Sequence, residues 1–455
     1  MSAVCISRCV LCGKGARAVR VRTPSEITPM RTVSEVKSTS IFYGWWLVLV
    51  CLLVQAVAAG ISIYFYSLLA GEVEREFSSG RALVMLGLTG SAITTSLLAP
   101  KMGDWLDRHS IRLIVSCSAI VMGTGFFAMS YTPTVWGFIA SYAVLVAAGT
   151  VTLSMLFAPV LLSRWFLRQR GLAIGIAALG TQLGGFVVPP LITLVIEAYD
   201  WRIAVRAVGL TVAVLIPLLS WRTIIDRPQM IGFGPDGDDP SKAELAADTD
   251  SPRLASGLST ILRDRSFWLA GFGIAVMVAM FTTVLANIAF FALDRGADRD
   301  QAAWLVSLYA LVGIVFSPLV GRFCDQLDIR VVFAGLLSIN IVALLLLRGA
   351  QDYQDLVYAT ALVAVSGGGF MPFWGAMIGR LFPLPQYGTV MGAMTLFAIS
   401  ASSLAPVLSG VLFDATGDYQ VLLLALTLLM VVALLCVPLI RPGQKASGAA
   451  QYGGA

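Results

Sequence analysis

Long apolar stretches recur along the whole chain and are separated by short polar segments. Most stretches are about 20 residues long, which is the length that an α-helix needs to cross the hydrocarbon core of a bilayer. They are continuously apolar and do not alternate at every second residue, as the strands of a membrane barrel would. The pattern predicts twelve membrane-spanning helices, at 44–68, 82–102, 112–131, 135–161, 171–196, 203–221, 267–292, 302–320, 331–348, 356–379, 388–412 and 420–440.

The composition supports an integral membrane protein. Hydrophobic residues make up 58% of the 455 residues and charged residues only 13%, whereas a soluble domain carries about 25% charged residues. The mean hydropathy is +0.84. So few polar residues could not cover the surface of a soluble fold of this length, so we predict an all-α protein whose main solvent is lipid.

The positions of Lys and Arg predict the orientation of the helices. With the N-terminus inside, most of the 31 cationic residues fall on the cytoplasmic side, as the positive-inside rule requires. We therefore expect a multi-pass protein of the plasma membrane, or of the inner membrane in a bacterium, with both termini cytoplasmic. The pI of about 8.8 then reflects topology, and no nucleic-acid partner is expected.

Two related halves are indicated by an internal repeat. GDWLDRHSIR, Gly103 to Arg112, recurs as GRFCDQLDIR, Gly321 to Arg330, about 217 residues later. RWFLRQRGLAIG, from Arg164, recurs loosely as RLFPLPQYGTVMG, from Arg380. We predict a disordered tail at 1–42, six-helix bundles at 43–221 and 266–440, a central cytoplasmic loop at 222–265 and a second tail at 441–455.

The repeated decapeptide resembles the signature G-x-x-x-D-[RK]-x-G-[RK]-[RK] of the major facilitator superfamily. This resemblance implies two pseudo-symmetric six-helix bundles and a loop that latches one half to the other on the cytoplasmic side. The alternative is a loop that only sets topology through its charges. The residues that carry the predicted gating role are Gly103, Asp107, Arg108 and Arg112 in the first copy and Gly321, Asp325 and Arg330 in the second.

Small residues cluster in the predicted fifth span, where Gly175 and Gly180 stand among further glycines. Such residues let membrane helices approach closely, and they also occur where helices move against each other. Both interpretations remain open, and we include these two glycines among the gating candidates.

A narrower resemblance covers most of residues 43–440. YGWW at 43–46, SRWFLRQRGLAIGIAALG at 163–180, DRPQMIGFGPDGD in the central loop and GVLFDATGDYQ near the end are similar to the monocarboxylate and oxalate/formate porter branch. The resemblance implies a monomeric secondary transporter that moves a small organic anion by alternating access. Proton symport and exchange for a counter-anion are both compatible with it.

Charged residues are confined to tails, loops and helix ends, so no midplane carboxylate is present to relay a proton. Where the branch carries Asp and Arg in span 8, this chain has Gly313 and Ser317. Arg202, Arg206 and Arg348 lie near outer helix ends, where we interpret them as interfacial residues. The cavity is therefore expected to be aromatic and nearly uncharged. Such a pocket suits a small organic acid, or alternatively a neutral or hydrophobic compound that is exported.

The substrate-binding candidates are the polar and aromatic residues of the spans that line the cavity in the superfamily. They are Gln55, Tyr64, Tyr66, Thr152, Ser154, Gln182, Asn287, Tyr309, Phe373 and Trp374.

Catalytic and cofactor chemistry is not expected. The only histidine, His109, excludes the usual His-based triads and multi-His metal sites. No G-x-x-x-x-G-K-[ST] loop for ATP occurs, which argues against a primary pump. Cys5, Cys9 and Cys12 have a spacing that ligates iron–sulfur clusters in radical enzymes, but no alternation of strands and helices follows it. We therefore expect no enzyme, cofactor or metal, and the intact repeats argue against a transport-dead sensor.

Overall fold

The computed structural model describes residues 42–238, 261–294, 297–416 and 419–440. Residues 1–41 of the tail predicted at 1–42 lie outside the described residues, including the cysteines at 5, 9 and 12, and so do the tail predicted at 441–455 and positions 239–260 of the central loop.

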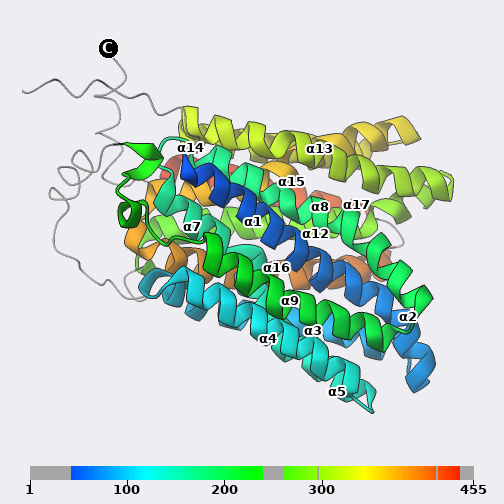
Figure 1. Ribbon diagram of the computed structural model, residues 1–455. Coiled ribbons are helices and arrows are strands. Elements are labelled where there is room, and N and C mark those ends of the chain that lie inside the picture. Colours follow the sequence, from blue (N-terminus) through cyan, green and yellow to red (C-terminus); the bar gives the residue numbers. More distant parts are fainter. Residues whose placement is uncertain (1–41, 239–260, 295–296, 417–418, 441–455) are drawn as a thin grey trace, which may run out of the picture. The chain divides into compact units, whose positions relative to one another are not determined.

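The first six spans form the first half of the chain (Figure 1). Span 1 and span 4 each contain several helical segments in series, and the others are single helices. In order, they are α1 Tyr43–Ala59, η2 Gly60–Phe65 and α2 Tyr66–Phe77; α3 Arg81–Arg108; α4 Ile111–Tyr131; α5 Val135–Ser141, η3 Tyr142–Val146, α6 Ala147–Thr150, η4 Val151–Leu156 and α7 Phe157–Trp165; α8 Arg170–Ala198; and α9 Trp201–Thr223.

Two short 3₁₀ turns, η5 Pro228–Ile231 and η6 Pro235–Gly237, follow α9 at the start of the central loop. The second half then repeats the six-helix order with uninterrupted helices. These are α12 Arg265–Asp294; α13 Arg299–Gln326; α14 Ile329–Gly349; α15 Tyr353–Leu381; α16 Tyr387–Thr416, preceded by the turn η7 Leu384–Gln386; and α17 Gln420–Cys436, which continues into η8 Val437–Leu439.

The prediction of twelve membrane-spanning helices is confirmed. Within the described ranges, twelve helices are long and apolar enough to cross a bilayer. Large apolar side chains are widely exposed on them, including Leu97 at 65% and Phe186 at 79%. In water such exposure would be costly, but on the outer face of a membrane bundle these side chains contact lipid.

The charged decapeptide is more helical than its predicted place between spans suggests. Span 2 was expected to end at 102, but α3 continues through Arg108, and α4 begins at Ile111. The extra turns are supported by an ion pair between Asp104 and Arg108 at i,i+4, with N and O atoms 2.8 Å apart. Asp107 therefore lies in the last turn of a rigid helix, which fixes its direction.

π-helical turns interrupt spans 1 and 4 of the first half at η2, η3 and η4. A π turn widens the helix and redirects side chains, and it is often found at functional sites. Two hydrogen bonds join the interrupted spans: the Tyr142 hydroxyl donates to the carbonyl O of Ser62, and Gln55 Nε2 donates to the carbonyl O of Ser154 at 3.1 Å. The irregular segments of the two spans therefore face each other.

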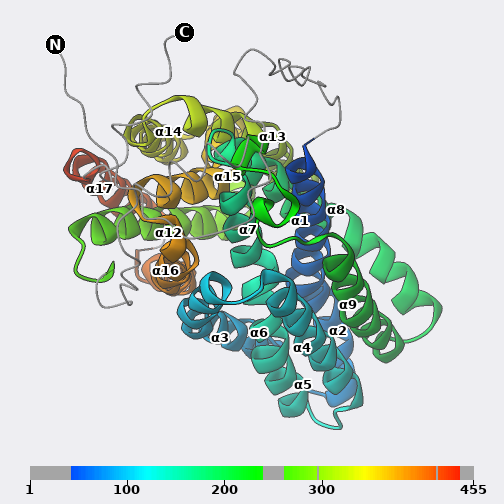
Figure 2. The same cartoon turned by 60° about the vertical axis from the view of Figure 1, so that its left-hand side comes forward.

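The two halves gather on different sides of the bundle, as the colours of Figure 2 show. They meet where α3 packs on α16 and where α8 packs on α13. Each contact includes a hydroxyl that bonds across the halves: Ser96 Oγ donates to the carbonyl O of Leu396 at 3.1 Å, and Ser317 Oγ donates to the carbonyl O of Gly175 at 2.9 Å. We call the end where α3 and α13 finish and α8 and α16 begin the latch end; it lies at the left of Figure 1.

Candidate functional site

At the latch end, Asp107 of the first half binds the N-terminus of α16 in the second half. Its carboxylate accepts hydrogen bonds from the backbone N–H of Gly388 at 2.8 Å, from the N–H of Thr389 at 2.7 Å and from the Thr389 hydroxyl at 2.9 Å. The first N–H groups of a helix have no partner inside it, and the helix dipole is positive there. Asp107 therefore satisfies these donors and places a negative charge where the helix favours one.

Asp325 makes the equivalent contact in the opposite direction. It lies in the last turn of α13, and its two carboxylate oxygens accept from the N–H of Gly171 at 2.7 Å and the N–H of Leu172 at 2.9 Å. Both donors belong to the first turn of α8 in the first half. Each half therefore caps a helix of the other half, and the internal repeat of the sequence becomes a reciprocal contact.

Glycines allow the backbones to approach closely enough for these bonds. A Cβ atom at Gly103 would lie 2.0 Å from the carbonyl O of Gly388, and one at Gly321 would lie 2.3 Å from the carbonyl O of Gly171. These distances are too short for any side chain. One turn further into the membrane, Gly175 also lies close to Ser317, where a Cβ would be 2.7 Å from the carbonyl O.

Two arginines outside the predicted gating set bind the helix ends that carry the capping carboxylates. Arg164 Nη2 donates to the carbonyl O of Leu106 at 2.5 Å, and Arg380 donates to the carbonyls of Leu327 at 2.5 Å and Asp325 at 3.0 Å. Each cation thus binds the C-terminal carbonyls of the helix that carries the acid. Both arginines begin a copy of the second repeated motif, so the repeat pointed to them. The sequence could not show which carbonyl groups they bind.

The remaining predicted gating residues contact their own half. Arg108 pairs with Asp104 in α3, and the Arg112 guanidinium lies over the Trp221 ring at 5.4 Å. Arg330 starts α14, where its N–H is bound by Asp328 at 2.8 Å. Gly180 packs on α1, because a Cβ there would lie 2.1 Å from the carbonyl O of Leu52. Gating roles for these four residues remain predictions.

Among the substrate candidates, Thr152 and Ser154 lie in the π-helical segment η4, and Gln55 of α1 binds the carbonyl O of Ser154. Gln55 and Thr152 are 3% and 0% exposed. Gln55 Oε1, Thr152 Oγ1 and Ser154 Oγ are buried and have no hydrogen-bond partner in the structure. Because an unpartnered buried polar group carries a free-energy cost, such groups mark places where a ligand or water binds.

Tyr66 and Phe373 lie within the packing of their own halves. The Tyr66 ring is 4.0 Å from that of Tyr142, and its hydroxyl donates to the carbonyl O of Val84 at 2.5 Å. The Phe373 ring lies 4.8 Å from that of Phe333 on α14. Substrate binding by Tyr66 and Phe373 remains a prediction, and the packing of both rings against their own half does not favour it.

Three other candidates lie on α8, α12 and α13. Gln182 of α8 lies beside Gly313 of α13, because a Cβ at Gly313 would be 3.6 Å from Gln182 Nε2. The Tyr309 hydroxyl approaches Gly367, and Asn287 Nδ2 donates to the carbonyl O of Thr283 at 2.8 Å.

Trp374 is buried on α15 beside Phe370, with ring centroids 5.3 Å apart, and its indole N–H has no partner. The side chain of Tyr64 lies outside the described residues.

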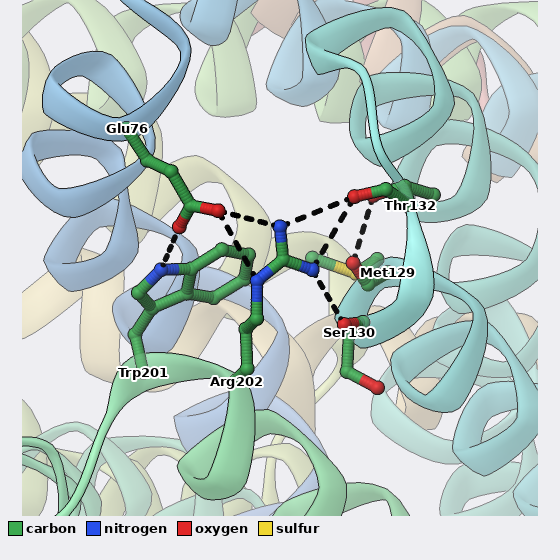
Figure 3. Close-up of polar contacts among 6 residues, drawn as sticks. All are labelled: Glu76, Met129, Ser130, Thr132, Trp201 and Arg202. Atoms are coloured by element: carbon green, nitrogen blue, oxygen red, sulfur yellow. Dashed lines mark hydrogen bonds and ion pairs between the residues drawn. The ribbon is translucent and has the colours of Figure 1, made fainter.

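The opposite end of the first half is fastened by Arg202, the first of the interfacial arginines (Figure 3). Its guanidinium binds Glu76 Oε1 at 2.6 Å and the carbonyl O of Ser130 at 2.6 Å, while Trp201 Nε1 donates to Glu76 Oε2 at 2.6 Å. This clamp joins the outer ends of α2, α4 and α9. Because Arg202 is engaged by these acceptors, it is structural rather than a substitute for a midplane cation.

The environment of Glu76 shifts its pKa downward. Partial burial acts to raise the pKa, but the hydrogen bonds from Arg202 and Trp201 and the Arg202 charge outweigh it. The carboxylate therefore stays ionised at a lower pH than an exposed glutamate.

Comparison with known proteins identifies the family and the fold. The family model of the Major Facilitator Superfamily matches residues 48–293 and 267–453. Monocarboxylate transporter 11 of Homo sapiens is 25% identical over 344 residues, covering 73% of this chain and 69% of the relative. The fujikurins efflux protein of Gibberella fujikuroi is 24% identical over 331 residues, covering 71% and 66%. A crystal structure of FucP in the outward conformation has a TM-score of 0.67 at 14% identity, over 88% of this chain and 99% of that one.

The Asp107 cap can be tested without knowing the substrate. Asp107→Asn removes the charge that holds the α16 N-terminus, so we expect amide hydrogen exchange in a peptide covering residues 387–391 to rise about tenfold, the effect of losing roughly 1.4 kcal/mol of local stability. Hydrogen exchange with mass spectrometry measures this. Asp104→Asn is the matched control, because Asp104 binds only Arg108 of its own helix among the contacts described. Equal exchange in the two variants would contradict the cap.

The clamp at Glu76 predicts a pH-dependent stability. Because the folded state lowers the pKa, the stabilisation is present above the ordinary pKa of a glutamate and is lost as the pH falls through the folded value. Glu76→Gln should therefore lower Tm at neutral pH, and its difference from the native protein should shrink on acidification. Thermal unfolding in detergent measures both. Glu72→Gln, which disturbs only an exposed pair with Arg75, is the control; a gap that stays constant with pH would refute the assignment.

Proposed function

The chain belongs to the Major Facilitator Superfamily and is a multi-pass membrane transporter of a small molecule, and we propose that its substrate is a small organic anion of the monocarboxylate kind. Transporters of this family are not enzymes, in agreement with the expectation from the sequence. The narrower substrate class is supported by the relatives named as monocarboxylate transporters, among them those numbered 11 and 2 of Homo sapiens.

The observation that carries the proposal is the set of unpartnered polar atoms at the π-helical segments. The Thr152 and Ser154 hydroxyls can donate to a carboxyl group, and Gln55 Oε1 can accept from a protonated one. Trp374 of the second half adds an unpartnered indole donor. Neutral donors and acceptors on both halves suit a single carboxyl group with an apolar body.

The modes of coupling that we propose rest on the absence of charged residues from the interiors of the spans. No Asp, Glu, Lys, Arg or His occurs in 44–71, 113–163, 171–196, 266–293, 331–347 or 356–379. A proton that crosses with the substrate must therefore travel on the acid itself, with Gln55 able to accept its O–H. Exchange of one anion for another is the second mode that this interior allows.

Alternating access uses the two reciprocal caps. In the described conformation Asp107 and Asp325 close the latch end, which we assign to the cytoplasmic side. Opening that side requires both carboxylates to leave the helix N-termini, so the caps stabilise the state that receives substrate from outside.

A second candidate function is export of a neutral or hydrophobic compound. The uncharged span interiors favour it, and so does the similarity to the fujikurins efflux protein. In this case the same orphan hydroxyls would bind hydroxyl or carbonyl groups of a larger apolar molecule.

The membrane orientation that we propose places both termini and the latch end in the cytoplasm of a monomer in the plasma membrane. It is supported by the arrangement of Lys and Arg in the sequence.

Thr152→Val tests the substrate site, because it replaces an orphan hydroxyl with a methyl group of nearly the same size. Removing an unpartnered buried hydroxyl should leave Tm unchanged or raise it. If the hydroxyl binds substrate, KM should rise about tenfold, the effect of one hydrogen bond of roughly 1.4 kcal/mol. The control is Thr124→Val, which removes an exposed hydroxyl bound to its own helix.

The assay is uptake of lactate, pyruvate, formate, oxalate and a short aromatic acid into proteoliposomes, with and without an inward proton gradient. Uptake of one acid with the predicted KM change supports the proposal. Native kinetics in Thr152→Val would remove this residue from the site, and no uptake of any acid by folded protein would favour export.

The orientation is tested by a cysteine at position 74, beyond the outer end of span 1. A membrane-impermeant maleimide added to intact cells should label Glu74→Cys well above the unmodified protein, whose native cysteines set the background. Labelling that appears only after the membrane is opened would reverse the topology.

A further inference from the structure

The first part of the central loop folds back on the latch end of the first half. We call residues 224–238 the strap. The carbonyl O of Ile225 accepts from Trp165 Nε1 at 3.0 Å, the carboxylate of Asp226 accepts from the N–H of Arg112 at 3.3 Å, and Phe233 packs edge-on against Phe42. The strap therefore has fixed contacts with α1, α4 and α7.

Asp236 at the tip of the strap binds the loop between α7 and α8. One carboxylate oxygen, Oδ2, accepts from the N–H of Leu167 at 3.1 Å and from the N–H of Arg168 at 2.9 Å. Its side chain is only 9% exposed, and Oδ1 has no partner. Asp236 has a φ of 59°, in the left-handed region that aspartate tolerates better than most residues. The residue that binds the two loop amides, Asp236, thus has a strained backbone and a buried charge.

The loop held by Asp236 leads directly into the N-terminus of α8, which Asp325 caps. Leu167 and Arg168 bind the strap, and Gly171 and Leu172 bind the second half. Two carboxylates from different parts of the chain therefore bind backbone N–H groups within residues 167–172. Asp236 binds the first two of these groups and Asp325 the last two. The position of the loop decides where the α8 amides point.

The equivalent turn in the second half is rigid for another reason. Phe382 precedes it with φ −124° and ψ 152°, close to the φ −122° and ψ 128° of Phe166. Phe382 is followed by Pro383, Leu384 and Pro385, and Phe166 by Leu167, Arg168 and Gln169, so prolines stand at two of the three positions in the second half. Proline fixes φ and has no N–H, so Pro383 and Pro385 stiffen the second turn without an acceptor from elsewhere in the chain.

We infer that Asp236 is a positioning residue for the latch: by binding the Leu167 and Arg168 amides, the strap performs for the first half what Pro383 and Pro385 perform for the second. The inference rests on the proposed alternating access, in which this latch opens and closes. The two capping carboxylates of the latch are therefore equivalent, but the turns before the capped helices are held differently, by Asp236 in the first half and by prolines in the second. A change in the central loop can loosen it from one side only.

The experiment is rescue of Asp236→Ala by Leu167→Pro. In Asp236→Ala we expect amide exchange in a peptide covering residues 170–174 to rise about tenfold, because the loss of two bonds to a charged acceptor frees the α8 N-terminus. Adding Leu167→Pro should restore exchange to within about twofold of the native protein. Leu167 is half exposed, and Phe166 already has the extended backbone that precedes a proline.

Asp238→Ala is the matched control, because it removes the exposed pair with Arg168 and leaves the loop amides bound. Exchange at 170–174 that is unchanged in Asp236→Ala, or that Leu167→Pro does not restore, would overturn the inference. If Asp236→Ala does not fold, Asp236→Asn replaces it, with the same rescue required. Exchange reports on the strap alone, whereas uptake in the same variants reports on alternating access, so the two proposals can fail separately.

Discussion

The structure depends on a carboxylate from each half that caps the first turn of a helix in the other half. Asp107 and Asp325 supply negative charge to the α16 and α8 N-termini, where unpaired N–H groups and the helix dipole favour it. Among the residues that the structure describes, no ion pair joins the halves across the membrane interior.

The capping geometry accounts for the small residues at the crossing points. Gly103 faces Gly388 and Gly321 faces Gly171, and no side chain could be accommodated at these contacts. Further into the membrane the halves touch through Ser96 and the Gly175–Ser317 contact, which are uncharged. Charge is thus concentrated at the wet latch end, and the interior keeps only neutral polar groups, because an unpaired charge in hydrocarbon is costly.

The two supports of the latch show how a repeated fold becomes asymmetric. The turn before α16 is stiffened by prolines within the chain, while the turn before α8 depends on Asp236 from the central loop. A similar contrast appears inside the halves: π-helical turns occur in spans 1 and 4, whereas α12 and α15 of the second half are uninterrupted. The first half thus combines the polar site with the support that the linker can reach.

The sequence by itself determined the twelve helices and the internal repeat, and it named Asp107 and Asp325 as gating candidates, because apolar length and repeated motifs are local patterns that a single chain displays. Only the tertiary structure decided the partners of those residues. The capped amides lie 281 and 154 residues away, and which backbone groups meet depends on helix packing. For the same reason the sequence could not show that Arg164 and Arg380 bind helix C-termini, that Tyr66 packs on Tyr142, or that Asp236 holds the α7–α8 loop.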